Sequence, residues 1–407
     1  MDTLELQLLG HPDRTIVDYV LSGFREGFRV GFHPNCVKLK SASSNCPSSH
    51  DHVGVIDDFL TAEIHAGRVV GPLKTLPFSY LQISRFGVIP KKNKVNAWRL
   101  ILDLSFPLGH SVNDGIDKSE FPVSYAKVDD AIRLIVKLGK GALMAKVDIK
   151  NAYRIVPIHP DDYYLLGMTW RQHYFVDLAL PFGLRSAPYI FNSLADLFQW
   201  SLIHNYLVPE LVHYLDDYLT LGPPASPVCG LSLRAIQQAA VDIGIPLAPD
   251  KIEGPTTCLT FLGIEIDSLQ MTVRLPLQKL SDLLTLTQQW VNKKSCKRKE
   301  LESLIGKLSH ACYIVPAGRT FLRRLLNLLR DSKRYWKVIR ITRDCQLDLQ
   351  WWLDFLPTWN GVYFFDLPER VPLADFELSS DAFAKKVLVC IIIALGFIER
   401  GCLLIHH

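Results

Sequence analysis

The stretch Leu211-Val-His-Tyr-Leu-Asp-Asp-Tyr-Leu-Thr-Leu221 places two adjacent carboxylates between apolar, β-prone residues. The apolar residues on both sides of Asp216 and Asp217 predict a β-hairpin with the two acids at its tip. Two carboxylates in such a position repel each other and resist desolvation. A pair of this kind is more often kept for a bound cation than for a structural reason, so we interpret it as a candidate metal site.

Three other pairs of adjacent aspartates have ordinary structural explanations. One lies on an amphipathic helical face (57–58), and one opens the helix predicted over 128–138, where acids suit the positive helix end. The third follows His159-Pro160 and predicts a turn (161–162). These pairs therefore give no reason to expect chemistry.

A magnesium site at the hairpin needs a further carboxylate from elsewhere in the chain. The best candidate is Asp148, which ends the strand-like segment Leu143-Met-Ala-Lys-Val-Asp-Ile149. Alternate residues of a strand face opposite sides, so Asp148 shares the more polar face with Lys146. An acid at the end of a strand is also a common structural feature, and this alternative stays open from the residues alone.

Length and composition limit the class of protein. The chain has 407 residues, of which 48% are hydrophobic and 21% charged, which excludes a disordered or collagen-like chain and predicts two to four domains. None of the nine cysteines forms a C-x-x-C pair, so we expect no zinc ribbon. Their odd number and wide spacing predict reduced thiols in an intracellular protein, in the cytoplasm or nucleus. The start shows no secretory signal, and the apolar run Val387–Ile398 is shorter than the roughly 20 residues that a membrane helix needs.

The charge is unevenly distributed. Between Lys293 and Arg343 there are 15 basic and 3 acidic residues, a local net of +12 in a chain whose net charge is +4. The leucine spacing predicts two amphipathic helices separated by Pro316-Ala-Gly318, with Lys297, Arg298 and Lys299 among their cations. Such a surface is typical of contact with a phosphate backbone, although a solvated helix face explains it equally well.

Four motifs then occur in a fixed order along the chain: Val147-Asp-Ile-Lys-Asn-Ala-Tyr153, Leu180-Pro-Phe-Gly-Leu-Arg-Ser-Ala-Pro188, Tyr214-Leu-Asp-Asp217 and Phe261-Leu-Gly263. Together they resemble the reverse transcriptases of retroelements, especially the gypsy-like and DIRS-like groups. Further support comes from His11-Pro-Asp-Arg14, residues 28–32, Arg298-Lys-Glu-Leu-Glu-Ser-Leu-Ile-Gly306 and Pro316-Ala-Gly-Arg319. The resemblance covers the chain up to about Asp381.

The resemblance implies an α/β (α+β) right-hand polymerase fold with fingers, palm and thumb. The domains expected are an N-terminal extension (1–52), fingers and palm (53–270), a thumb (271–335), a connection (336–374) and a truncated ribonuclease H-like start (375–407). Only one acid, Glu399, follows Asp381, whereas a ribonuclease H site needs more carboxylates. We therefore expect no ribonuclease H activity.

For the catalytic centre, the resemblance implies that Asp148 and Asp216 hold two Mg²⁺ ions, with Mn²⁺ as an alternative, about 3.5–4 Å apart. Asp217 completes the group of acids. Tyr153 would lie beneath the incoming sugar and exclude a ribose 2′-hydroxyl. Its alternative is a packed core tyrosine.

The remaining substrate contacts are also implied by resemblance. Phe182 and Gly183 would form the turn that supports the templating base and the nucleotide, although an ordinary turn explains them too. Arg99 and either Lys91 or Lys92 would bind the triphosphate, because the planar guanidinium suits phosphate oxygens. Lys251 would lie near the leaving pyrophosphate. The primer grip would be a hairpin of Phe261, Leu262 and Gly263, whose alternative is a buried strand with a glycine kink.

The predicted function is that of an RNA-directed DNA polymerase of a retrotransposon. Its partners would be an RNA or DNA template with a primer, together with dNTPs. Two alternatives stay open: a catalytically silent relict that only binds nucleic acid, and a different polymerase or nucleotidyltransferase. Tyr153 argues against the use of ribonucleotides by the last class.

Overall fold

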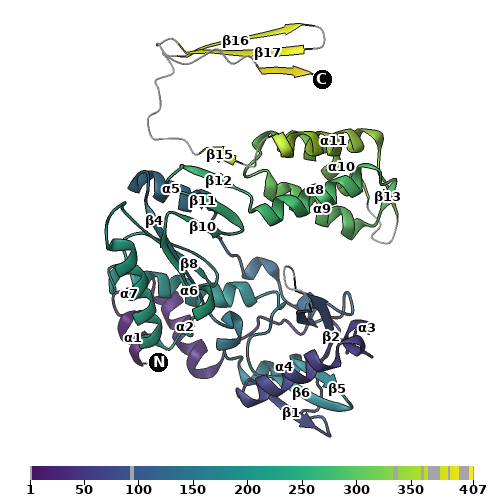
Figure 1. The fold of residues 1–407 in the computed structure, drawn as a ribbon. Coiled ribbons are helices and arrows are strands. Elements are labelled where there is room, and N and C mark those ends of the chain that lie inside the picture. The colour runs from purple at the N-terminus through teal and green to yellow at the C-terminus, as the bar shows by residue number, and fades with distance from the viewer. Residues whose placement is uncertain are drawn as a thin grey trace. The chain divides into compact units, whose positions relative to one another are not determined.

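The computed structural model describes residues 2–91, 96–332, 338–358, 362–364, 376–383, 386–393 and 403–406, with side chains as far as Pro357. The chain divides into two compact units, Met1–Tyr363 and Phe364–His407. Figure 1 shows sheets in the earlier part of the first unit and a group of helices towards its C-terminal end. Lys92, Trp336 and Trp359 lie outside the described residues.

The N-terminal sheet has the strand order β1-β6-β5-β2-β3. Its strands are Val69–Leu73, His173–Asp177, Gly167–Trp170, Ile83–Pro90 and Trp98–Asp103. The sequence over 77–104 predicts short strands around the polar loop 91–96, and the β2–β3 pair confirms them. Helix α4 (Val53–His65) packs its apolar side on β1 and β3, with Ile56 and Leu60 in a shared core.

The helix α4 is shorter than the helical pattern over 56–70 predicts. Gly67 adopts a φ of +70°, which ends the helical run, and Val69 already pairs with Asp177 as the first residue of β1. The prediction was wrong for the last residues, because apolar residues such as Val69 and Val70 suit a strand as well as a helix.

The central sheet is antiparallel and has the strand order β7-β8-β4-β9. Its strands are Leu211–Tyr214, Asp217–Gly222, Leu143–Asp148 and Glu253–Thr256. The hairpin of β7 and β8 confirms the one predicted over 211–221. Helices α5 (Val128–Leu138), α6 (Ala187–His204) and α7 (Val228–Ile243) pack against it, and the first two match the predicted helices.

The N-terminal segment contributes to the core beneath the central sheet. Helices α1 (Asp2–Gln7) and α2 (Arg14–Glu26) place Leu4, Val17 and Val20 in the same buried cluster as α6. The aromatic stretch over 19–32 predicts a helix of that extent, but α2 ends at Glu26. Gly27 has a φ of +96°, and a Cβ there would lie 2.4 Å from the backbone nitrogen of His159, so only glycine fits this close approach.

A third sheet has the order β10-β11-β12-β15, with strands Cys258–Phe261, Ile264–Asp267, Thr272–Arg274 and Val362–Phe364. It leads into helices α8 (Leu277–Val291), α9 (Arg298–Ala311), α10 (Arg323–Asp331) and α11 (Arg343–Thr358). A 3₁₀ turn, η6 (Pro316–Leu322), separates α9 from α10, which confirms the two predicted helices and their break. A short pair, β13 (Ser295–Cys296) and β14 (Ile339–Arg340), joins the loops beside them.

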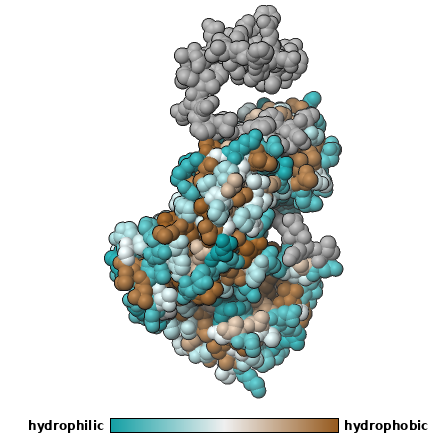
Figure 2. All heavy atoms as spheres, turned by 60° about the vertical axis from the view of Figure 1, so that its left-hand side comes forward, coloured by the Kyte–Doolittle hydropathy of each residue, from teal (hydrophilic) through white to brown (hydrophobic). Residues whose placement is uncertain are grey.

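The second unit contains three antiparallel strands, β16 (Phe376–Phe383), β17 (Lys386–Ile393) and β18 (Leu403–His406). Asp381 lies opposite Leu388 in their register. On the face of the protein in Figure 2, hydrophilic and hydrophobic residues are intermixed. None of the helices in the described ranges combines the length and the apolar character that crossing a bilayer requires.

Candidate active site

The antiparallel pairing of β4 and β8 brings the predicted acids together. Asp148, the last residue of β4, lies directly opposite Asp217, the first residue of β8. Leu215 and Asp216 form the hairpin turn, where Leu215 has a φ of +53°. The backbone N–H of Ile149 donates to the carbonyl oxygen of Asp216 at 3.0 Å, which fixes this turn against the end of β4. Three carboxyl groups therefore converge at one end of the central sheet.

The electrostatics of this end show an excess of negative charge. Burial, followed by the charges of Asp216 and Asp148, raises the pKa of Asp217 to about 7. Burial also raises the pKa of Asp216, with a further contribution from Asp148. The cation in contact with Asp148 is Lys251, at the end of the 3₁₀ turn η5 (Pro249–Lys251), whose Nζ donates to both Asp148 carboxylate oxygens at 2.7 and 2.8 Å.

The site fits a magnesium ion that is shared with a substrate. Among the described residues, no set of three or more His, Cys, Asp and Glu side chains is arranged as a closed metal cage. The acids nevertheless offer oxygen ligands only, and one ammonium group does not balance three carboxylates. Mg²⁺ characteristically binds through one or two carboxylates plus substrate phosphates. Asp148, Asp216 and Asp217 as its ligands stay a prediction.

Tyr153 lies next to these acids. It belongs to the 3₁₀ turn η3 (Ala152–Ile155) that follows β4, and its ring centroid is 4.9 Å from that of Phe182 and 5.4 Å from that of Phe191. Burial raises the pKa of its hydroxyl, as do the neighbouring Tyr125 and Asp216. The structure thus places Tyr153, the predicted sugar contact, beside Phe182, the predicted base contact. Asp216, a predicted metal ligand, is near Tyr153.

A residue that the sequence did not point to, Asn113, stabilises the turn of Phe182 and Gly183 through hydrogen bonds. Phe182 is 57% exposed, and Gly183 adopts a φ of +92°. Asn113, which is buried, donates from Nδ2 to the Gly183 carbonyl at 2.9 Å and accepts from the Arg185 backbone N–H at 2.8 Å. A single asparagine in a polar loop carries no periodic signal, so only the fold shows this support.

Two residues predicted to bind the triphosphate, Lys91 and Arg99, belong to the β2–β3 hairpin. The backbone N–H of Lys91 donates to the Ala97 carbonyl at 2.7 Å and so closes the hairpin, while Arg99 is exposed on β3 opposite Ile89. None of the described contacts joins Lys91 or Arg99 to the acids of the central sheet. Their role stays a prediction.

The predicted primer grip is the tight turn between β10 and β11. Phe261 is buried, whereas Leu262 and Gly263 have φ values of +49° and +75°, typical of a two-residue hairpin. Lys279 Nζ donates to the Gly263 carbonyl at 2.9 Å, and His310 Nε2 lies 3.2 Å from the Leu262 carbonyl oxygen. A cavity of about 360 Å³ is lined by Lys146, Asp217, Thr260, Phe261, Leu262, Gly263 and Lys279. One acid and the turn therefore share a cavity.

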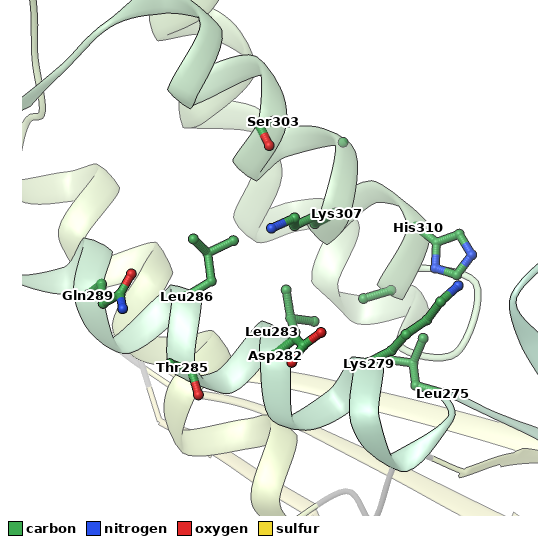
Figure 3. Close-up of a pocket in the computed structure, with 12 residues that line it drawn as sticks. Leu275, Lys279, Asp282, Leu283, Thr285, Leu286, Gln289, Ser303, Lys307 and His310 are labelled. Atoms are coloured by element: carbon green, nitrogen blue, oxygen red, sulfur yellow. The ribbon is translucent and has the colours of Figure 1, made fainter. Parts of the chain in front are cut away.

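A larger groove of about 810 Å³ lies between α8 and α9. Figure 3 shows Lys279, Lys307 and His310 on its walls, together with Leu283 and Leu286. Arg298 was predicted among the exposed cations of the basic helices, but it is half-buried. It donates to Glu302 at 2.8 Å and to the Leu329 carbonyl at 3.1 Å, because the end of α10 needs partners for its last carbonyls.

Residues 89–266 match the family described as reverse transcriptase (RNA-dependent DNA polymerase). This match covers 178 of the 407 residues. Among curated proteins, the chain is 23% identical over 249 residues to the transposon Tf2-3 polyprotein of Schizosaccharomyces pombe, covering 61% of this chain and 17% of that polyprotein. It is 23% identical over 259 residues to the Pro-Pol polyprotein of feline foamy virus, covering 61% and 20%. The chain thus matches about a fifth of these relatives' length.

Solved structures show to which fold the chain is similar. The foamy viral protease-reverse transcriptase in complex with an RNA/DNA hybrid superposes with a TM-score of 0.59 at 15% identity, covering 93% of this chain and 46% of the other. The complex of foamy viral protease-reverse transcriptase dRH with double-stranded DNA gives 0.57 at 18% identity, covering 88% and 55%. The predicted α/β right-hand polymerase fold is therefore confirmed.

Proposed function

We propose that this chain is an RNA-directed DNA polymerase of a retrotransposon, which adds dNTPs to the 3′ end of a primer. The observation that carries the proposal is the convergence of Asp148, Asp216 and Asp217 beside a cavity that the turn at Gly263 also lines. Carboxylates alone would suit other metal-dependent chemistry. Their place next to Tyr153 and to a primer-grip turn favours nucleotide addition at a primer end.

Each residue near the acids has a defined task in this proposal. When bound, two Mg²⁺ ions would lower the pKa of the primer hydroxyl and neutralise the triphosphate. Asp148 and Asp216 would hold these ions, and Asp217 would support them. Lys251, which lies against Asp148, is placed to meet the leaving pyrophosphate.

The remaining finer predictions rest on resemblance. They are the gypsy-like or DIRS-like placement and the binding of the triphosphate by Arg99 with Lys91 or Lys92. The proposed intracellular location rests on the cysteine pattern. We also propose that β16–β18 begin a ribonuclease H-like sheet, because three antiparallel strands with Asp381 on the first suit such a start. The expected lack of ribonuclease H activity stays a prediction.

Primer extension tests the proposed function directly. Purified protein with poly(rA), an oligo(dT) primer, dTTP and Mg²⁺ should lengthen the primer, and omission of the metal should stop the reaction. The measurement is the length distribution of labelled primer with time. Binding of the template–primer without any extension would support the silent relict instead. Extension with rNTPs as efficient as with dNTPs would favour a different nucleotidyltransferase.

The basic surface of α9 gives a second prediction. Lys297, Lys299 and Lys307 are exposed, so replacing all three with glutamine should weaken binding of the template–primer. The slope of log K against log salt should become shallower by up to about 3, since each lost phosphate contact removes about 0.9. Fluorescence anisotropy at several salt concentrations measures this slope.

A matched variant controls for the loss of three charges. Arg133, Lys137 and Lys140 are exposed on or just after α5, within the residues that match the family model, whereas α9 lies outside them. Their replacement with glutamine should leave the slope nearly unchanged. Equal effects of the two triple variants would mean that the nucleic acid is not bound at α9.

A further inference from the structure

Arg154, the residue after Tyr153 in η3, is a buried cation with a full set of partners. Its side chain is 6% exposed. The guanidinium donates to Glu63 from Nε at 2.9 Å and from Nη2 at 2.7 Å. It reaches Asp177 from Nη1 and from Nη2, both at 2.8 Å, and Nη1 also donates to the Ala179 carbonyl at 3.1 Å. Each of the three guanidinium nitrogens therefore donates at least one hydrogen bond.

These partners come from two segments of the chain, one around Glu63 and one over residues 177–180. Glu63 lies in the last turn of α4, and Asp177 ends β6 of the N-terminal sheet. Ala179 and Leu180 lead directly into the turn of Phe182 and Gly183. The carbonyl oxygen of Leu180 is 3.5 Å from Nη1 of Arg154. One side chain thus ties the Tyr153 turn to the N-terminal sheet and to the start of the Phe182 turn.

The charges of this network balance inside the protein. Glu63 also accepts two hydrogen bonds from Arg68, at 2.7 and 2.8 Å, and Asp177 accepts from the Ala179 backbone N–H at 3.2 Å. Two cations face two carboxylates. A buried polar network in which every member is satisfied is rigid and favours one arrangement of its segments.

We propose that Arg154 is a positioning residue for nucleotide selection, and this inference rests on the proposed polymerase function. By holding η3 and residues 179–180 together, it fixes the ring of Tyr153 against the ring of Phe182, 4.9 Å away. Tyr153 selects the sugar only if its ring stands at a defined distance from the incoming nucleotide. A displacement of about 1 Å in such a site can change a rate about 100-fold.

Two variants test the proposal. Arg154→Lys keeps the charge but offers one ammonium group, which cannot bind two carboxylates and a carbonyl with the geometry of a guanidinium. Glu63→Gln keeps an acceptor for Arg154 and removes one carboxylate of the network. Single-nucleotide incorporation is measured with dTTP and UTP on an RNA template. For both variants we expect the KM for dTTP to rise about tenfold and the preference for dTTP over UTP to fall about tenfold, with the Kd for template–primer unchanged.

Asp162→Asn is the matched control. Asp162 is as buried as Asp177 and also pairs with an arginine, Arg29, at 2.9 and 3.0 Å, but it contacts neither Tyr153 nor the Phe182 turn. This variant should melt at a lower temperature, as the two test variants do. Its KM for dTTP and its preference for dTTP should stay those of the unmodified protein.

The outcomes separate positioning from stability. If Arg154 had only a structural role, its variants would contain less folded protein. The apparent kcat would then fall equally for both nucleotides, while KM and the preference for dTTP stayed unchanged. This result would overturn the proposal. If Arg154→Lys does not fold, Glu63→Gln decides, and loss of folding in both variants would assign the network to stability alone. If the unmodified protein extends no primer, the proposed function fails first, and the inference fails with it.

Discussion

Replacing Asp216 with asparagine is expected to reduce primer extension about a thousandfold, because a lost metal ligand removes about 4 kcal/mol of transition-state stabilisation. The fold should be kept. Burial and the charge of Asp148 raise the pKa of Asp216, so its ionised form opposes folding and a neutral amide of the same shape relieves that repulsion. The measurements are the extension rate with Mg²⁺ and the melting temperature without it.

A control for Asp216→Asn is Asp58→Asn on the exposed side of α4, which should extend primers at the normal rate. Both variants replace one aspartate with asparagine, in one case at the end of the central sheet and in the other on the exposed side of α4. A near-normal extension rate for Asp216→Asn would show that the carboxylates at the end of the central sheet are not the catalytic group.

Replacing Tyr153 with valine is expected to reduce the preference for dNTPs over rNTPs about 100-fold, because the side chain that would clash with a 2′-hydroxyl becomes small. The ring now fills the space between Phe182 and Phe191. Its loss should therefore also weaken dNTP binding, but to a lesser degree. The ratio of kcat/KM for dTTP and UTP measures the effect.

Tyr153→Phe is the matched control for this variant, since it keeps the ring and removes only the hydroxyl. It should retain the preference for dNTPs. If valine at this position also leaves the ratio unchanged, Tyr153 is a packed core tyrosine, which was the alternative that the sequence left open.

Much of the local structure followed from sequence patterns. The apolar residues around Asp216 and Asp217 predicted the hairpin of β7 and β8, and the leucine spacing after Lys297 predicted α9, η6 and α10. The resemblance carried by the four ordered motifs implied the polymerase fold. These features depend on residues close together in the chain, whose periodicity is visible without knowledge of what they pack against.

The details of the site depended on packing between distant segments. Arg298 was predicted as a surface cation, yet it donates to carbonyls at the end of α10. Asn113 supports the turn at Gly183, and Arg154 joins η3 to α4 and β6, although neither residue belongs to a recognisable pattern. Each of these side chains has partners that are remote in sequence.

The sequence by itself determined which acids, aromatic residues and turns are present and which elements carry them. Only the tertiary structure decided that Asp148 lies opposite Asp217, that Lys251 contacts Asp148, and that the buried Arg154 binds Glu63 and Asp177. The physical reason is that local periodicity reports which face of an element is apolar. The partner of a buried charge is instead chosen by strand pairing and by the need to satisfy every buried donor and acceptor.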